Sequence, residues 1–168
     1  SCEMRFYLML QIAICDDIPA YQQIIQSEIE KVLKLSHKIT LFSTGKEFLE
    51  KLSEGKCPYQ IVFMDIDFGT ENISGISIAK KISAVNPMTQ IIFISQYLEF
   101  ASDVYETAHV YFIIKNRLSE LLGKALNTAL SKLSEVQKQH LYFRTKQGLQ
   151  KVDIHKIWYM EKNLRNTI

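Results

Sequence analysis

Apolar residues gather along this chain in two kinds of segment. Short runs rich in Ile, Val, Phe and Met predict five strands, at Leu10–Cys15, Lys38–Ser43, Gln60–Ile66, Gln90–Ile94 and His109–Ile114. Apolar residues three and four apart between them predict five helices, at Pro19–Leu33, Thr44–Ser53, Ile73–Val85, Leu98–Thr107 and Arg117 to about Gln139. Strands that are apolar on both faces and alternate with helices predict an α/β fold, with a doubly wound five-stranded parallel sheet covered by helices on each side.

Polar residues follow four of the five predicted strands. Asp16 and Asp17 follow the first strand, Asp65 ends the third, Ser95 follows the fourth and Lys115 follows the fifth. In a parallel sheet these positions lie at one edge, where such folds place their sites. Three carboxylates repel one another unless a cation lies between them, and oxygen ligands suit Mg²⁺. A carboxylate held there can act as a nucleophile towards phosphorus.

Each of these residues also has an ordinary structural interpretation. Asp16 and Asp17 could cap a helix, Ser95 could be a loop hydroxyl and Lys115 a surface lysine. Their joint occurrence at strand ends, in this order, favours a functional site over four unrelated surface residues.

The end of the chain has a different pattern. Segments 141–146 and 149–154 around Gln147-Gly148 predict a β-hairpin, and residues 157–160 predict another short strand. Residues 1–136 carry 13 Lys and Arg against 16 Asp and Glu, whereas residues 137–168 carry 7 against 2. An acidic first part and a basic end indicate two functions, although a basic tail can also simply be solvated.

Composition narrows the class of protein. The chain has 168 residues, of which 47% are hydrophobic and 23% charged, as in soluble globular proteins. Cys2, Cys15 and Cys57 form neither a disulfide framework nor a zinc pattern, and Cys15 is expected to be a small buried hydrophobe. We find no secretion signal and no membrane span, and we expect a cytoplasmic location. The first eight residues are expected to be an extension.

The strand ends resemble those of response regulator receiver domains. The matching segments are Ile-Ala-Ile-Cys-Asp-Asp at 12–17, Ile-Val-Phe-Met-Asp-Ile at 61–66, Ile-Ile-Phe-Ile-Ser at 91–95 and Tyr-Phe-Ile-Ile-Lys at 111–115. The resemblance implies a flavodoxin-like receiver fold over residues 10–134, with Asp65 as phosphoacceptor. It also implies that Asp17 and Asp65 bind Mg²⁺ directly, with the backbone carbonyl of Asp67, and that Asp16 binds it through water.

The same resemblance assigns roles to three further residues. Lys115 would pair with the phosphoryl group, Ser95 would move towards it, and Phe112 would be the switch aromatic that turns inward. The family usually has Pro after the lysine, commonly with a cis peptide bond, whereas this chain has Asn116. The implied protein is not an enzyme beyond slow autodephosphorylation, and its partner is a sensor histidine kinase.

Residues 143–161 resemble the opening of a LytTR-type DNA-binding domain. We therefore expect residues 135–168 to be a linker and the truncated start of such an all-β domain, which needs roughly a hundred residues by family resemblance. The longer protein would control transcription by binding DNA, whereas this chain alone would bind no specific site. The alternative is a hairpin that merely extends the first domain.

Two other functions and one assembly remain open. Asp65-Ile-Asp67 with Thr70 is similar to the signature of haloacid-dehalogenase-like phosphatases, but Thr70 lies one residue too late. A second rival is a phosphate-independent receiver-like interaction module.

The last predicted helix has two apolar stripes. One stripe is Leu118, Leu122, Ala125 and Ala129, and the other is Leu121, Leu126, Leu130 and Leu133. Two stripes favour a homodimer, unless the second packs within the same chain.

Overall fold

The computed structural model describes residues 9–69, 72–140, 142–145 and 148–151. Contacts divide the chain into one unit from Ser1 to Ala129 and another from Leu130 to Ile168. Within the described residues, no helix is long and apolar enough to cross a membrane.

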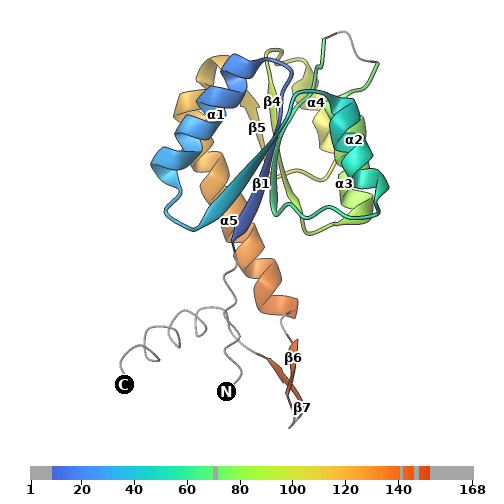
Figure 1. Ribbon diagram of the computed structural model, residues 1–168. Coiled ribbons are helices and arrows are strands. Elements are labelled where there is room, and N and C mark those ends of the chain that lie inside the picture. The colour runs from blue at the N-terminus through green and yellow to red at the C-terminus, as the bar shows by residue number, and fades with distance from the viewer. Residues whose placement is uncertain (1–8, 70–71, 141, 146–147, 152–168) are drawn as a thin grey trace. The chain divides into compact units, whose positions relative to one another are not determined.

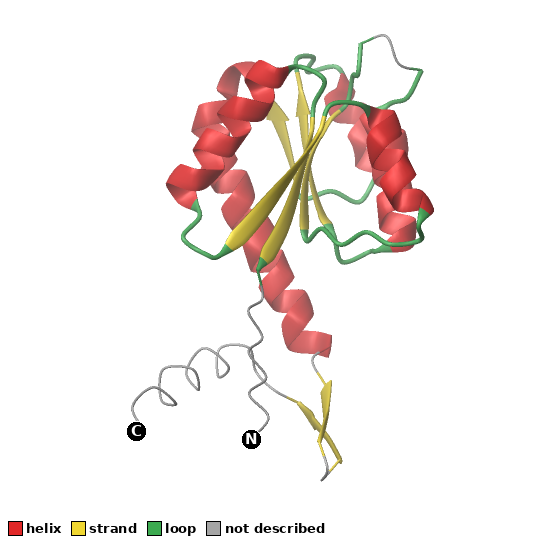
Figure 2. Cartoon of the chain, viewed as in Figure 1, coloured by secondary structure: helices red, strands yellow, loops and turns green. Residues whose placement is uncertain are grey.

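The first unit is built on one parallel sheet (Figures 1 and 2). Its strands are β1 (Leu10–Cys15), β2 (His37–Phe42), β3 (Ile61–Asp65), β4 (Gln90–Ser95) and β5 (Tyr111–Ile114). Their order is β2-β1-β3-β4-β5, and every neighbouring pair is parallel. This confirms the predicted α/β class and doubly wound sheet. The direction of winding reverses between β1 and β3, which is where such sheets place their sites.

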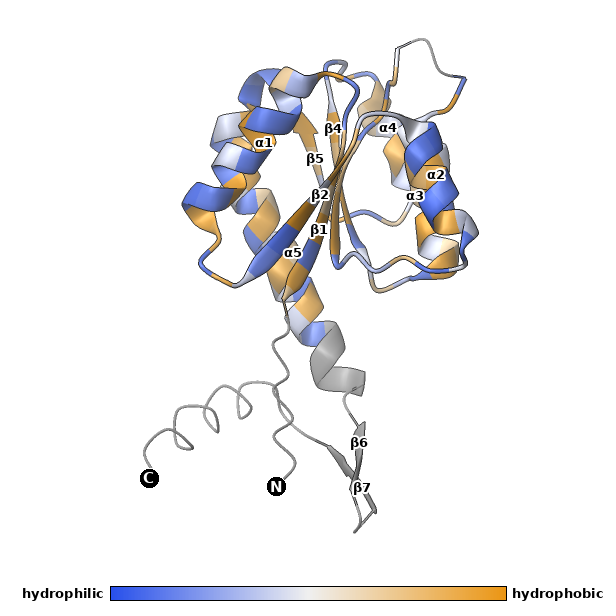
Figure 3. Cartoon of the chain, viewed as in Figure 1, coloured by the Kyte–Doolittle hydropathy of each residue, from blue (hydrophilic) through white to orange (hydrophobic). Residues whose placement is uncertain are grey.

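Helices cover both faces of this sheet. They are α1 (Pro19–Val32), α2 (Gly45–Ser53), α3 (Gly75–Val85), α4 (Phe100–Asp103) and α5 (Leu118–His140). α1 and α5 lie on one face, whereas α2, α3 and α4 lie on the other (Figure 1). The helices carry both polar and apolar residues, whereas the central strands β3 and β4 are mostly apolar and β2 is partly polar (Figure 3). β3 and β4 are buried along their whole length, so the core is the sheet itself with the inner helix faces.

Local signals explain several helix ends. Pro19 opens α1, where its missing N–H costs nothing. Thr44 caps α2, because its Oγ1 accepts the Glu47 N–H at 3.1 Å and Glu47 Oε2 accepts the Ser43 N–H at 3.1 Å. α1 differs from expectation, since its capping position is Ile18 and no side chain caps it there.

The structure corrects the prediction near β5. The helix expected over Leu98–Thr107 is a single α-helical turn, Phe100–Asp103, followed by a 3₁₀ turn at Val104–Glu106. β5 begins at Tyr111 rather than at His109. The apolar residues of this segment are too sparse to bury a long helix.

The second unit contains one described hairpin. β6 (Tyr142–Thr145) pairs antiparallel with β7 (Gly148–Lys151). The predicted strand at residues 157–160 lies outside the described residues. On α5, the first predicted stripe is buried in full, and in the second Leu126 and Leu133 are buried while Leu121 and Leu130 are half-buried. The second stripe therefore offers less free apolar surface than the sequence suggested.

Candidate functional site

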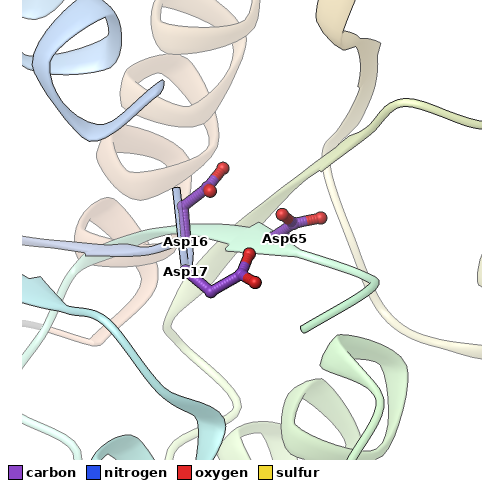
Figure 4. Close-up of side chains that lie close together, drawn as sticks. All are labelled: Asp16, Asp17 and Asp65. Atoms are coloured by element: carbon purple, nitrogen blue, oxygen red, sulfur yellow. The ribbon is translucent and has the colours of Figure 1, made fainter. Parts of the chain in front are cut away.

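Three carboxylates meet at the edge of the sheet where the winding reverses. Asp16 and Asp17 follow β1, and Asp65 is the last residue of β3, the strand beside it. One oxygen from each carboxylate lies within 4.8 Å of the others. Figure 4 shows the three side chains converging from the two strand ends. Asp16 and Asp65 are buried, at 1% and 3% exposure, so two of the three charges are largely removed from water.

The turn after β1 is fixed by its own side chains. Asp16 Oδ1 accepts the Ile18 N–H at 2.9 Å, which leaves Asp16 Oδ2 directed at the site. The buried amide of Gln22, on α1, donates to the Asp16 carbonyl at 2.8 Å and lies 3.1 Å from the Phe42 carbonyl. Gln22 therefore ties the backbone of the acidic turn to the end of β2.

The turn after β3 depends on two glycines. α3 begins so close to the sheet that a β-carbon on Gly75 would overlap the carbonyl oxygen of Asp65. Gly69 has a φ of 61°, which disfavours any residue with a β-carbon, and a β-carbon there would lie 3.3 Å from Asp17 Oδ2. Asp65 Oδ1 accepts the Asp67 N–H at 3.2 Å. Glycines at these two positions thus let the backbone pass close to Asp65 and to the Asp17 carboxylate.

Lys115 joins the two buried carboxylates. Its ammonium donates to Asp65 Oδ2 at 2.6 Å and lies 2.8 Å from Asp16 Oδ2. The approach to Asp16 Oδ2 lies outside the angular range of a hydrogen bond, and this oxygen has no hydrogen-bond partner. The ammonium also lies over the ring of Tyr21, 4.1 Å from its centroid. Lys115 begins a 3₁₀ turn that ends at Arg117 and leads into α5.

The charges at this site do not balance without a further cation. Burial, and after it the charge of Asp16, raise the pKa of Asp65 to about 7, although Lys115 opposes this shift. Burial works to lower the pKa of Lys115, but the attraction of the Asp16 and Asp65 carboxylates outweighs burial and raises it. One lysine cation therefore faces three carboxyl groups, two of them buried.

The donor set fits Mg²⁺. Three carboxylates supply hard oxygen ligands, and Asp16 Oδ2 is a buried oxygen that lacks a hydrogen bond. A divalent cation would also relieve the repulsion that raises the pKa of Asp65. Asp16, Asp17 and Asp65 are thus the residues that could hold the metal.

Two predicted switch residues lie on the neighbouring strands. Ser95, at the end of β4, is fully buried, and its Oγ accepts the Tyr97 N–H at 3.0 Å. Phe112, on β5, is half-buried and packs against the core cluster that includes Phe93, its partner in the sheet register. Ser95 ends β4, the strand beside β3, whereas Phe112 lies within β5, and no hydrogen bond between Ser95 and Asp65 is found among the described residues.

The residue after the lysine departs from the pattern that the resemblance implies. Asn116 occupies the usual place of Pro, and none of the described peptide bonds is cis. The chain instead passes from β5 through the short 3₁₀ turn, with the Lys115 side chain still buried between the two carboxylates.

An open hollow adjoins the loop after β3. Its volume is about 340 Å³, and it is lined by Ile66, Asp67, Asn72, Ile73, Ser74 and Phe100. Its lining comes from that loop and from Phe100, the first residue of α4.

Sequence reasoning missed three residues of this site. Tyr21 and Gln22 lie on α1, and their partners lie on other segments of the chain: Lys115 for Tyr21, and the Asp16 and Phe42 carbonyls for Gln22. No local sequence pattern marks such contacts. Gly75 follows Ser74 at the start of α3, where glycine is also an ordinary helix-start residue. The glycine at the start of the helix that follows Asp65 was the one sequence signal that could have indicated a close approach of that helix to the site.

The comparisons with known proteins agree with this geometry. The family model described as the response regulator receiver domain matches residues 12–127. No curated protein matches the chain. The segment expected to begin a LytTR-type domain lies beyond the residues that this family model matches.

Solved structures share the fold. The response regulator DrrB from Thermotoga maritima, an OmpR/PhoB homologue, is 21% identical with a TM-score of 0.61, and the match covers 74% of this chain but 54% of DrrB. A CheY-like receiver from Methanospirillum hungatei is 19% identical with a TM-score of 0.62, over 76% of this chain and 98% of that one. The response regulator TrrA from Thermotoga maritima, solved in complex with Mg²⁺ and BeF, is 26% identical with a TM-score of 0.58, over 71% and 99%. This chain therefore spans about half of DrrB.

Proposed function

This chain belongs to the response regulator receiver domain family, and from that premise we propose that Asp65 accepts a phosphoryl group from a sensor histidine kinase. Receiver domains are phosphoacceptor signalling modules, and a histidine kinase is the partner that such a module implies. The observation that carries the proposal is the position of Asp65, a buried carboxylate beside two others and 2.6 Å from a lysine ammonium. The family match leaves no support for the phosphatase alternative.

The chemistry follows from the two oxygens of Asp65. One oxygen forms a bond to phosphorus while the bond between phosphorus and the donor's imidazole nitrogen breaks, and the imidazole keeps the electron pair and is protonated. Asp65 Oδ1 is oriented by the Asp67 N–H, and Oδ2 by Lys115. Both contacts hold the carboxylate still, so little ordering is left for the moment of attack.

Charge neutralisation is the second requirement. Asp17 and Asp65 would hold Mg²⁺ directly with the Asp67 carbonyl, and Asp16 through water. When bound, the metal supplies positive charge to the oxygens of the transferred group. Support comes from the fit of the three carboxylates and from TrrA, whose structure holds Mg²⁺ with BeF. Lys115 would transfer its hydrogen bond from Asp65 to the phosphoryl oxygens.

Ser95 and Phe112 form the proposed switch. The Ser95 hydroxyl accepts the Tyr97 N–H but its own proton has no described acceptor, so it is available to a phosphoryl oxygen. Movement of Ser95 would leave space towards which the half-buried ring of Phe112 can turn. A charge change at Asp65 would in this way be converted into a change of packing near α4 and β5.

Labelling tests the phosphoacceptor directly. The protein is incubated with Mg²⁺ and acetyl phosphate, and intact-mass spectrometry is used to look for one added phosphoryl group. We expect one acid-stable, base-labile adduct on the wild type and none on Asp65→Asn. Asp103→Asn, which removes a carboxylate from α4, is the matched control and should be labelled normally. Equal labelling of Asp65→Asn would assign the acceptor elsewhere.

The output function is the finer part of the proposal. We propose a receiver over residues 10–134 and a linker with the start of a LytTR-type DNA-binding domain over residues 135–168. Support comes from the basic charge of residues 137–168 and from the resemblance of residues 143–161 to that domain. In an electrophoretic mobility experiment, this chain should show only weak, salt-sensitive DNA binding. Sequence-specific binding that persists at physiological salt would contradict this.

We also propose that the chain forms a homodimer through α5, through residues 141–168, or through both. Support is limited to the second apolar stripe of α5, in which Leu121 and Leu130 remain half-buried although Leu126 and Leu133 are buried. Sedimentation at micromolar concentration should show a dimer without phosphorylation. A monomer would exclude it, and a dimer that survives removal of residues 141–168 would place the contact on the receiver.

A further inference from the structure

Lys115 has a third partner that lies outside the acidic cluster. Tyr21 is in the first turn of α1, and its ring lies under the Lys115 ammonium, 4.1 Å from centroid to nitrogen. The Lys115 side chain is only 2% exposed, so the contact takes place away from bulk water. A desolvated ammonium over an aromatic face is attracted by the negative potential of the ring, more strongly than at an exposed site.

The three contacts of Lys115 differ in what happens to them during the proposed reaction. Asp65 Oδ2 and Asp16 Oδ2 are both oxygens of the acidic cluster, and both belong to the set that fits Mg²⁺. Metal binding and phosphorylation of Asp65 each draw on these oxygens. The Tyr21 ring is neutral and is not a ligand for a hard cation. Of the described contacts of Lys115, the ring is thus the one that neither event consumes.

The two carboxylates would otherwise compete for the lysine. Each uses one oxygen on a backbone N–H of its own turn and turns the other towards Lys115. When Asp65 carries the phosphoryl group as an acyl phosphate, the remaining carboxylate of Asp16 attracts the ammonium away from that group. A ring on the side of α1 offers attraction that does not depend on either carboxylate, and it occupies space into which the lysine could withdraw.

We propose that Tyr21 is a positioning residue that holds the Lys115 ammonium at the phosphoryl-transfer site through its ring face. This inference rests on the proposed function, because Lys115 matters to the reaction only if Asp65 accepts a phosphoryl group. Tyr21 acts through Lys115 and is not itself a catalytic residue. The hydroxyl of Tyr21 has no part in the role, so a phenylalanine should replace it.

Two substitutions distinguish the effect of the aromatic face of Tyr21 from the effect of its side-chain volume. Tyr21→Phe keeps the aromatic face, whereas Tyr21→Leu keeps an apolar side chain without it. With acetyl phosphate and saturating Mg²⁺, we expect Tyr21→Phe to be phosphorylated within about twofold of the wild type and Tyr21→Leu about tenfold more slowly. When the acetyl phosphate concentration is varied, Tyr21→Leu should show its loss in the maximal rate of phosphorylation. Tyr105→Leu, at a tyrosine that is 84% exposed, is the matched control and should not change the rate.

A spectroscopic measurement tests the geometry without any reaction. The ring current of Tyr21 should shift the Lys115 ε-methylene resonances upfield in the metal-free wild type and in Tyr21→Phe, but not in Tyr21→Leu. The Lys124 resonances, on the exposed side of α5, should be the same in all three proteins. If Tyr21→Leu does not fold, Tyr21→Met replaces it in both measurements.

The outcomes separate this inference from the proposed function. A wild-type rate in Tyr21→Leu overturns the inference, and so does an equal loss in Tyr21→Phe, which would assign the effect to the hydroxyl. If the wild type takes up no phosphoryl group, the proposed function fails by itself. The chemical shift then decides the positioning of Lys115, and an upfield shift retained in Tyr21→Leu overturns it.

Discussion

Gly75 packs directly against the backbone of Asp65, with no room between them for a side chain. A β-carbon at position 75 would overlap the Asp65 carbonyl oxygen, and it would also meet the Asp65 carbonyl carbon and the backbone of Ile66. These are main-chain atoms of a buried strand, so they cannot move aside as the end of a flexible side chain could. The start of α3 and the backbone of Asp65, the proposed phosphoacceptor, are therefore coupled through one glycine.

Gly75→Ala should lower the free energy of unfolding by about 1–3 kcal/mol, the usual cost of forcing extra volume into a packed site. Urea denaturation followed by circular dichroism measures the change. Gly123→Ala is the matched control, because a β-carbon there would meet Val32 at 3.4 Å, an ordinary contact, and alanine favours a helix. The control should be neutral or stabilising. A Gly75→Ala protein as stable as the wild type would show that α3 can shift away from Asp65.

The raised pKa of Asp65 predicts how stability changes with pH in metal-free buffer. Burial, followed by the charge of Asp16, raises this pKa from 3.8 to about 7. The folded protein then binds the Asp65 proton more tightly than the unfolded chain does. The stability that protonated Asp65 contributes is therefore full below pH 3.8 and is lost as pH rises to about 7.

Asp65→Asn should consequently raise the thermal midpoint more at pH 8 than at pH 4, because it removes a carboxylate that is ionised and repelled only at the higher pH. Differential scanning fluorimetry in the presence of a chelator measures both midpoints. Addition of Mg²⁺ should stabilise the wild type and so narrow the difference in thermal midpoint between the wild type and Asp65→Asn at pH 8. An equal effect of the substitution at both pH values would show that Asp65 has an ordinary pKa.

The strand ends were the part of the site that the sequence could predict. Asp16, Asp65 and Lys115 each follow a strongly apolar strand, and the parallel topology brings strand ends together without any knowledge of side-chain contacts. The helix before β5 was predicted too long, since helical spacing over a few residues does not determine whether tertiary packing completes the helix.

The contacts across α1 could not be predicted in the same way. Tyr21 and Gln22 follow each other on one helix, yet one lies against Lys115 and the other against the Phe42 carbonyl. These pairings are set by the angle at which α1 crosses the sheet, and residue spacing carries no information about that angle. Two successive polar or aromatic residues near a helix start are ordinary in sequence.

Lys115→Ala should separate metal binding from signalling. The substitution leaves Asp16 and Asp65 without the cation that they share, so the metal-free protein should lose stability at pH 8. Mg²⁺ should restore much of it and should bind at least as tightly as in the wild type, measured by titration calorimetry. Phosphorylation-linked changes near Phe112, followed by NMR, should be lost. Lys124→Ala, at an exposed lysine of α5, is the control. Loss of Mg²⁺ binding in Lys115→Ala would contradict the separation.

Gln22 should matter to the metal site although it touches no ligand oxygen. Its amide donates to the Asp16 carbonyl at 2.8 Å and is 3.1 Å from the Phe42 carbonyl, and the residue is 6% exposed. Gln22→Leu keeps the buried volume but leaves both carbonyls without this donor. The loss of such buried hydrogen bonds costs about 1–3 kcal/mol. Gln23→Leu, at the next and exposed position of α1, should cost little.

The informative measurement on Gln22→Leu is the Mg²⁺ affinity of the folded protein, at a temperature well below its midpoint. Asp16 and Asp17 are carried by the turn that Gln22 ties to the end of β2, so a looser turn must be ordered again when the metal binds. We expect affinity to fall about threefold to tenfold, as for other partners that support metal ligands from behind. Stability alone would fall if Gln22 merely filled the core. Unchanged Mg²⁺ affinity in a destabilised Gln22→Leu protein would therefore limit its role to packing, whereas a loss of affinity that Gln23→Leu does not share would place the amide in the support of the acidic turn.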